Sequence, residues 1–157
     1  MAYKVFISHS ATSEDAAIIN QILQHSATLG IQCYMAEHDV QAGLPLKDKL
    51  QEEIQAADCL LAFVTRSTAS SDWVKWEVGI ADGMRKLVIP VVEQDIPLPG
   101  YIHGKEYISC YPADPAKTAT SVSAYLTKLK VAKDNVNRIV WLVLLVLGAV
   151  VLFSGKK

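Results

Sequence analysis

The chain has 157 residues, of which 51% are hydrophobic, with 15 basic and 16 acidic side chains and a formal net charge of −1. This length fits one domain. Because four of the basic residues and one of the acidic residues follow Lys130, the first 130 residues are acidic overall, which argues against nucleic acid as a partner.

Strand-like and helix-like segments alternate along these 130 residues. Short runs rich in β-branched and aromatic residues predict five strands, at Tyr3–Ile7, Ile31–Met35, Cys59–Val64, Leu87–Val92 and Tyr107–Cys110. Capping residues and apolar periodicity predict four helices. The first is capped by Gly30, the second opens at Pro45, the third carries Trp73 and ends near Gly83 to Lys86, and the fourth spans about Pro115 to Lys130.

Such alternation predicts right-handed crossovers and a parallel sheet with helices on both faces. We therefore expect an α/β, flavodoxin-like three-layer sandwich with a five-stranded sheet in the order 2-1-3-4-5. In this topology ligands bind outside the carboxyl ends of strands 1 and 3. The loops at that place are Ser8–Asp15 and Arg66–Asp72.

The helix after the second of these loops places a carboxylate on an aromatic stripe. Trp73, Trp76, Glu77, Ile80 and Met84 recur at spacings of three and four and so share one face. One interpretation is that Glu77 packs its stem at the stripe's edge while its head reaches water. The other is a carboxylate held beside an aromatic wall to stabilise positive charge on a sugar. The predicted ligand crevice favours the second interpretation.

Four segments, in this order and spacing, resemble boxes of the TIR domain family. They are Val5-Phe-Ile-Ser-His-Ser10 with the acidic loop after it, the loop from Asp39 through Gly43, Asp72-Trp-Val-Lys-Trp-Glu77, and Lys86-Leu-Val-Ile-Pro-Val91. The third is similar to the Trp-x-x-x-Glu pattern of TIR domains that cleave NAD. The resemblance covers about residues 1–130.

The resemblance implies roles for single residues. Glu77 corresponds to the catalytic glutamate and Trp73 to the indole that lines the nicotinamide-ribose pocket. The other implied substrate contacts are Phe6, Ser8, His9, Ser10, Asp39 and Gly43, the last two in a loop over 39–46 that opens the site or joins neighbouring domains. His9 is either a base or, as we prefer, a polar contact, and Trp76 is a core or an assembly residue, of which we prefer core.

The implied function is that of an NAD+ glycohydrolase or ADP-ribose cyclase in immune or stress signalling, such as antiphage defence, activated by self-association. NAD+ is then a substrate and no cofactor is expected. Since the three cysteines and the histidines show no metal-ligand spacing, we also expect no metal. The alternative is a non-enzymatic adaptor that recruits other TIR proteins. A phospho-receiver domain fits poorly, because the third strand ends in Thr65-Arg66-Ser67 and offers no Asp.

The C-terminal tail is apolar and uncharged over residues 139–153. A membrane-spanning helix needs about 20 residues, with a lower limit near 17. We therefore expect a TIR domain at 1–130, a linker at 131–138 and a membrane-spanning helix at 139–155, with the domain in the cytoplasm because no signal peptide opens the chain. The alternative is a buried or dimerising helix.

Overall fold

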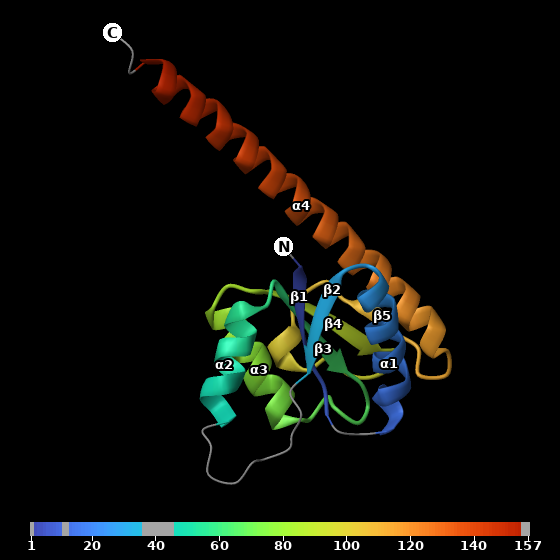
Figure 1. Cartoon of the computed structure of the whole chain (residues 1–157). Helices are drawn as coiled ribbons and strands as arrows, with labels where there is room; N and C mark the ends of the chain where they lie inside the picture. The colour runs from blue at the N-terminus through green and yellow to red at the C-terminus, as the bar shows by residue number, and fades with distance from the viewer. Residues whose placement is uncertain (1, 11–12, 36–45, 155–157) are drawn as a thin grey trace.

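The computed structural model describes residues 2–10, 13–35 and 46–154, which form a five-stranded parallel sheet in the order β2-β1-β3-β4-β5. The strands are β1 (Tyr3–Ser8), β2 (Ile31–Met35), β3 (Cys59–Val64), β4 (Leu87–Glu93) and β5 (Ile108–Cys110). The predicted strands, their order and their parallel direction are thus confirmed (Figure 1).

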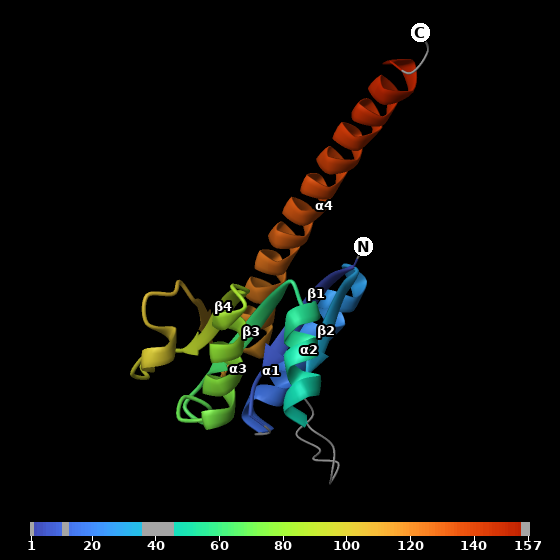
Figure 2. The same cartoon turned by 90° about the vertical axis from the view of Figure 1, so that its left-hand side faces the viewer.

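Helices lie on both faces of the sheet (Figures 1 and 2). They are α1 (Ser13–Thr28), α2 (Leu46–Ala56), α3 (Asp72–Gly83) and α4 (Pro115–Ser154), with a short 3₁₀ turn, η1, at Gly100–Ile102. Helices α1 and α4 pack on one face, and α2 and α3 on the other. The predicted α/β three-layer arrangement is therefore present.

Alternation along β1 divides its side chains between the two faces. Tyr3, Val5 and Ile7 pack with α1 and α4, whereas Phe6 packs with α2 and α3. Because successive strand residues point to opposite faces, Ser8 lies on the same face as Phe6. The last residue of β1, which lies between β2 and β3 in the sheet, is thereby directed toward α3.

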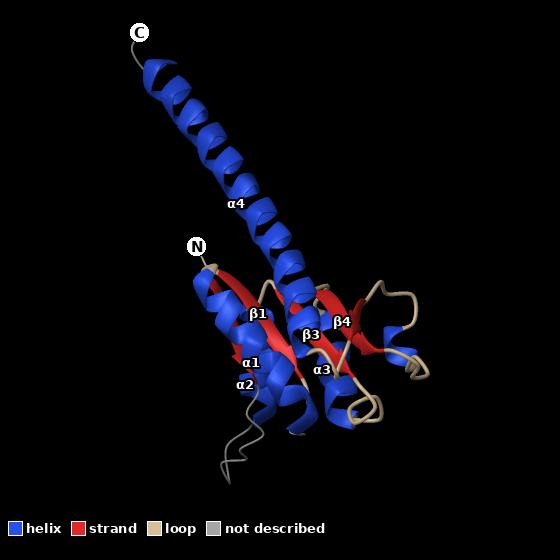
Figure 3. Cartoon of the chain, turned by 90° about the vertical axis from the view of Figure 1, so that its right-hand side faces the viewer, coloured by secondary structure: helices blue, strands red, loops and turns tan. Residues whose placement is uncertain are grey.

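The helix α4 extends far beyond the sheet (Figure 3). Residues 131–138, predicted as a linker, lie within this helix, so no break in the backbone separates the domain from the tail. Lys133 Nζ contacts both carboxylate oxygens of Asp58, at 2.7 and 2.8 Å, and this ion pair fastens α4 beside the start of β3.

Farther along α4, the side chains of Ile139 to Leu144 are exposed, Trp141 at 68%. Within the part of the chain that the structure describes, however, no helix combines the length and apolarity needed to cross a bilayer. The prediction of a membrane-spanning helix at 139–155 is therefore not supported.

Candidate functional site

The site forms where β1 ends beside α3, at the carboxyl edge of the sheet. Ser71 caps the N-terminus of α3, its side chain accepting a hydrogen bond from the backbone N–H of Val74. Glu77 follows on the next turn, pointing back to the sheet. There the Ser8 hydroxyl donates a hydrogen bond to Glu77 Oε2, joining residues 69 positions apart. Both side chains are fully buried.

Ser8 is paired with a small residue of the neighbouring strand. Ser8 lies opposite Ala62 in the pairing of β1 with β3, and Ala62 belongs to the buried cluster beneath α3. Its methyl group leaves space above the sheet that a larger side chain would fill. The Glu77 carboxyl group occupies the region between this pair of strands and α3.

Burial controls the ionisation of Glu77. Loss of water around the carboxylate raises its pKa from 4.5 to about 7, while interactions with the side chains of Ser8 and Trp73 oppose this rise. Oε1, the second carboxylate oxygen, has no hydrogen-bond partner among the described residues. Burial therefore brings the pKa of Glu77 close to neutral pH, where both the acid and the base form of the carboxyl group are accessible.

The two indoles of α3 lie next to each other. Trp73 is half-buried, and its ring centre lies 5.4 Å from that of Trp76 with the two planes tilted by 41°. Both indoles pack against the buried cluster beneath α3. Lys47 Nζ lies 5.9 Å from the centre of the Trp76 ring. Trp76 therefore packs on the core and also contacts a surface cation.

The other predicted contacts divide into three groups. Phe6 is fully buried and packs against Tyr34 with ring centres 5.6 Å apart, so in this structure it belongs to the core. His9 Nδ1–H donates to the carbonyl oxygen of Ser10 at 2.8 Å, and both residues are half-buried next to Ser8. Asp39 and Gly43 lie outside the described residues.

One buried polar cluster was missed by the sequence reasoning. The Thr65 hydroxyl donates to Asp15 Oδ2 at 3.3 Å, which links the end of β3 to the first turn of α1. Thr68 Oγ1 accepts from the Thr65 amide and donates to the Phe63 carbonyl, each at 2.7 Å. These bonds hold the turn that leads into α3. A Thr-x-x-Thr pattern at a strand end is the signal that could have indicated it.

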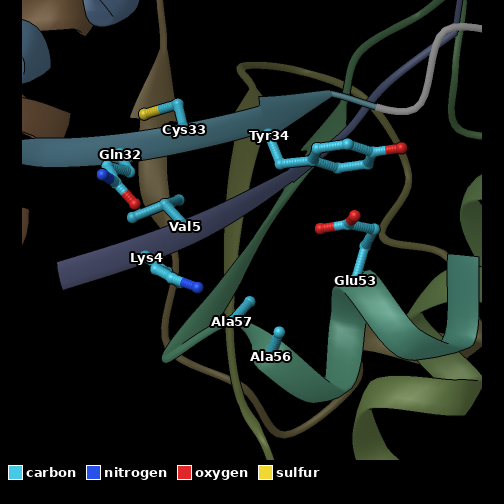
Figure 4. A pocket seen from close by; sticks show the side chains of 8 residues that line it. All are labelled: Lys4, Val5, Gln32, Cys33, Tyr34, Glu53, Ala56 and Ala57. Atoms are coloured by element: carbon cyan, nitrogen blue, oxygen red, sulfur yellow. The ribbon is translucent and has the colours of Figure 1, made fainter. Parts of the chain in front are cut away.

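A cavity of about 190 Å³ lies elsewhere, between β2, β1 and α2 (Figure 4). It is lined by Lys4, Val5, Gln32, Cys33, Tyr34, Glu53, Ala56 and Ala57. Its β1 residues are at the beginning of that strand, whereas Ser8 is at the end, so this cavity is distinct from the Ser8–Glu77 contact. Across the described residues, three or more His, Cys, Asp or Glu side chains do not gather in any arrangement that could bind a metal ion.

A family profile and several solved structures match this chain. A family profile described as "TIR domain" matches residues 5–122. Among solved structures, the TIR domain of a Toll-related receptor from Hydra magnipapillata is 15% identical with a TM-score of 0.61, over 80% of this chain and 98% of that chain. The search of curated proteins gives no match.

Two enzymes also share the fold. The 2-deoxyribosyltransferase of Bacillus psychrosaccharolyticus is 16% identical with a TM-score of 0.56, over 71% of this chain and 88% of that chain. The CMP N-glycosidase of Clostridium botulinum is 17% identical with a TM-score of 0.54, over 82% and 98%. At these identities the likeness concerns the fold alone.

Proposed function

This chain belongs to the TIR domain family, and we propose that it is an enzyme that cleaves the ribose–nicotinamide bond of NAD+, with Glu77 as the catalytic carboxylate. The observation that carries the proposal is the Glu77 carboxyl group itself. It is buried at the carboxyl edge of the sheet, one helical turn from the indole of Trp73, and accepts a hydrogen bond from Ser8, the last residue of β1. NAD+ is the substrate in this proposal.

The chemistry of the bond suits a single carboxylate. Nicotinamide is already cationic in NAD+, so it leaves as a neutral molecule without being protonated. Positive charge then develops on ribose C1′, where a carboxylate in a dry, apolar site stabilises it strongly. Attack by water at C1′ gives ADP-ribose, and attack by a nucleophile of the same molecule gives a cyclic product. Trp73 supplies an aromatic surface on which the nicotinamide ring can stack.

The reaction needs the ionised form of Glu77. Below its pKa of about 7 the group is protonated and neutral, and a neutral carboxyl group stabilises a cation poorly. We therefore expect kcat/KM for NAD+ to rise with pH through about 7, since this parameter reports the ionisation of the free enzyme. The fold is compatible with such chemistry, because a glycosidase and a deoxyribosyltransferase of nucleosides or nucleotides are built on it.

Substrate access requires a conformational change. Glu77 has no exposed surface in this structure, so NAD+ reaches the carboxylate only after neighbouring side chains move. We assign this opening to self-association of TIR domains, which makes the single chain a resting state. Turnover should then rise more steeply than in proportion to protein concentration.

The proposal is tested by incubating the full-length protein with NAD+ at high concentration with a crowding agent and separating the products by HPLC. Glu77→Gln keeps the size and removes the charge, and it should release no nicotinamide. Glu53→Gln makes the same chemical change on α2, away from the site, and should match the wild type. Nicotinamide release by Glu77→Gln at the wild-type rate would exclude this role, and the co-product distinguishes hydrolase from cyclase.

The complete burial of Glu77 favours a second candidate, a non-enzymatic adaptor that recruits other TIR proteins. A carboxylate that remains closed to solvent in the assembled state cannot meet a substrate. In that case assemblies detected by light scattering should release no nicotinamide, and Glu77→Gln should assemble as the wild type does. Nicotinamide release that depends on both assembly and Glu77 would exclude a purely adaptor role.

A further inference from the structure

The hydroxyl group of Ser8 has one hydrogen atom to donate, and the structure commits it to Glu77. The bond runs from Ser8 Oγ to Glu77 Oε2, and neither side chain has exposed surface. A hydroxyl that donates to a carboxylate cannot donate to a substrate oxygen at the same time. The family resemblance implied a substrate contact for Ser8, and in the structure its hydroxyl donates to Glu77.

We propose that Ser8 is a positioning residue, which holds the Glu77 carboxylate in place for NAD+ cleavage and does not itself bind the substrate. This inference rests on the function proposed above. Ser8 is well placed for the role because β1 lies between β2 and β3: its neighbour Ile7 is paired with Met35 of β2, and Ser8 itself is paired with Ala62 of β3. Helix α3, which carries Glu77, packs on β1 and β3 through buried apolar side chains.

The surroundings of Glu77 make this one bond important. From the described elements packed on α3, the side chains that bear on its ionisation are Ser8 from β1 and Trp73 from α3 itself, and no charged group contributes. His9 follows Ser8 in sequence, but its Nδ1 is bonded to the Ser10 carbonyl. Removing the Ser8 hydroxyl would leave the buried carboxylate with weaker support from polar groups.

The expected effect follows from the strength of such bonds. A hydrogen bond to a charged group supports the ionised form by roughly one to two pKa units. Without it the pKa of Glu77 should rise from about 7 to roughly 8–9. The ionised fraction at pH 7 would then fall by roughly 5- to 50-fold, and the fraction at pH 9 by about two-fold or less.

The test compares Ser8→Val with Ser8→Thr in the full-length protein. Valine and threonine have nearly the same shape, and each is one heavy atom larger than serine, but only threonine keeps the hydroxyl group. We expect kcat/KM of Ser8→Val at pH 7 to be roughly 5- to 50-fold below that of Ser8→Thr, with the two converging near pH 9. KM at pH 9 should be equal within about two-fold. A KM defect in Ser8→Val that persists at pH 9 would overturn the inference, because it would mark Ser8 as a substrate contact.

A second readout works without catalysis. The Glu77 carboxyl carbon can be titrated by ¹³C NMR, with its signal assigned by its absence in Glu77→Gln. Its midpoint should be higher in Ser8→Val than in Ser8→Thr by roughly one unit or more. Ser8→Ala, which adds no volume, should behave like Ser8→Val and serves if the larger residues impair folding. Equal midpoints would refute the Ser8–Glu77 coupling, whereas shifted midpoints in a protein without NAD+ turnover would refute the proposed function alone.

Discussion

Replacing Glu77 by glutamine should stabilise the protein and inactivate it at the same time. The folded state raises the pKa of this carboxyl group from 4.5 to about 7, so the folded chain binds the proton more tightly than the unfolded chain. The contribution of Glu77 to the free energy of unfolding is then most favourable below pH 4.5, where both states are protonated. It falls as the pH rises from 4.5 to about 7, and above that range the full cost of burying the charge is present.

The pKa difference sets the size of the effect. One pKa unit corresponds to about 1.4 kcal/mol, so the ionised group should cost about 2 kcal/mol at pH 6 and about 3 kcal/mol at pH 8. Glutamine has nearly the same volume and can accept the Ser8 hydrogen bond without carrying charge. For a chain of this size, about 3 kcal/mol corresponds to a rise in melting temperature of roughly 6–12 °C.

Thermal unfolding of wild type and Glu77→Gln, followed by circular dichroism from pH 4 to pH 8.5, measures this difference. We expect the two melting temperatures to agree near pH 4 and to separate steadily above pH 5, with Glu77→Gln the higher. Glu53→Gln should follow the wild-type curve throughout. A gap between wild type and Glu77→Gln that does not change with pH would refute the reasoning, since a packing effect carries no proton dependence.

Three further predictions test the wall beside the site and the anchoring of α4. Trp73→Phe keeps an aromatic ring in place but removes the indole, which lowers the pKa of the proposed catalytic carboxyl group. The value of kcat/KM for NAD+ should therefore fall more at pH 7 than at pH 9. Equal losses at the two pH values would contradict this role. Leu126→Ala opens a cavity where α4 meets the sheet and should reduce the free energy of unfolding by about 2–5 kcal/mol in urea titrations. Leu144→Ala, at an exposed position, should change it by less than about 0.5 kcal/mol. Asp58→Asn weakens the ion pair with Lys133 and should lower the free energy of unfolding by about 1 kcal/mol at low ionic strength and by less in high salt. A loss that does not depend on salt would show that charge is not what holds α4 there.

The fold was predictable because the strands carry continuous apolar runs and the helices carry periodic ones. Two details were not. One is Pro90, which lies within β4 opposite Ala62 although proline has no amide hydrogen to donate to a strand ladder. Strand β5 pairs with β4 only from Val91 onward, so the missing amide of Pro90 falls just before this ladder.

The end of α4 was also mispredicted. The change in composition after Lys130 suggested a boundary, but a helix ends where its backbone is interrupted or capped. Residues 131–138 contain neither glycine nor proline. The ion pair of Lys133 with Asp58, which joins residues 75 positions apart, stabilises the helix in this region and is invisible in a local sequence pattern.

The sequence predicts that Trp73 and Glu77 lie close together, but it does not predict the hydrogen-bond partner of Glu77. The spacing of Trp73 and Glu77 places them one turn apart in any helix, so their proximity follows from the sequence. The partner of Glu77 depends on the register of β1 against β3, which sets Ser8 opposite Ala62. The resemblance implied a substrate contact for Phe6, and the structure buries Phe6 in the cluster between β1, α2 and α3. A strand buried on both faces gives no outward signal in its sequence.

The candidate site and the ion pair that anchors α4 lie at opposite ends of the sheet. Glu77 and Ser8 meet at the carboxyl ends of the strands, whereas the Asp58–Lys133 ion pair lies at the start of β3, and α4 extends from that end away from the sheet (Figures 1 and 2). A partner bound to the exposed apolar residues of α4 therefore does not cover Glu77. It can act on the site by bringing domains together, which raises their effective concentration. If self-association opens the carboxylate, as we propose, the neighbouring domain makes its contact at the other end of the sheet, close to Ser8 and α3.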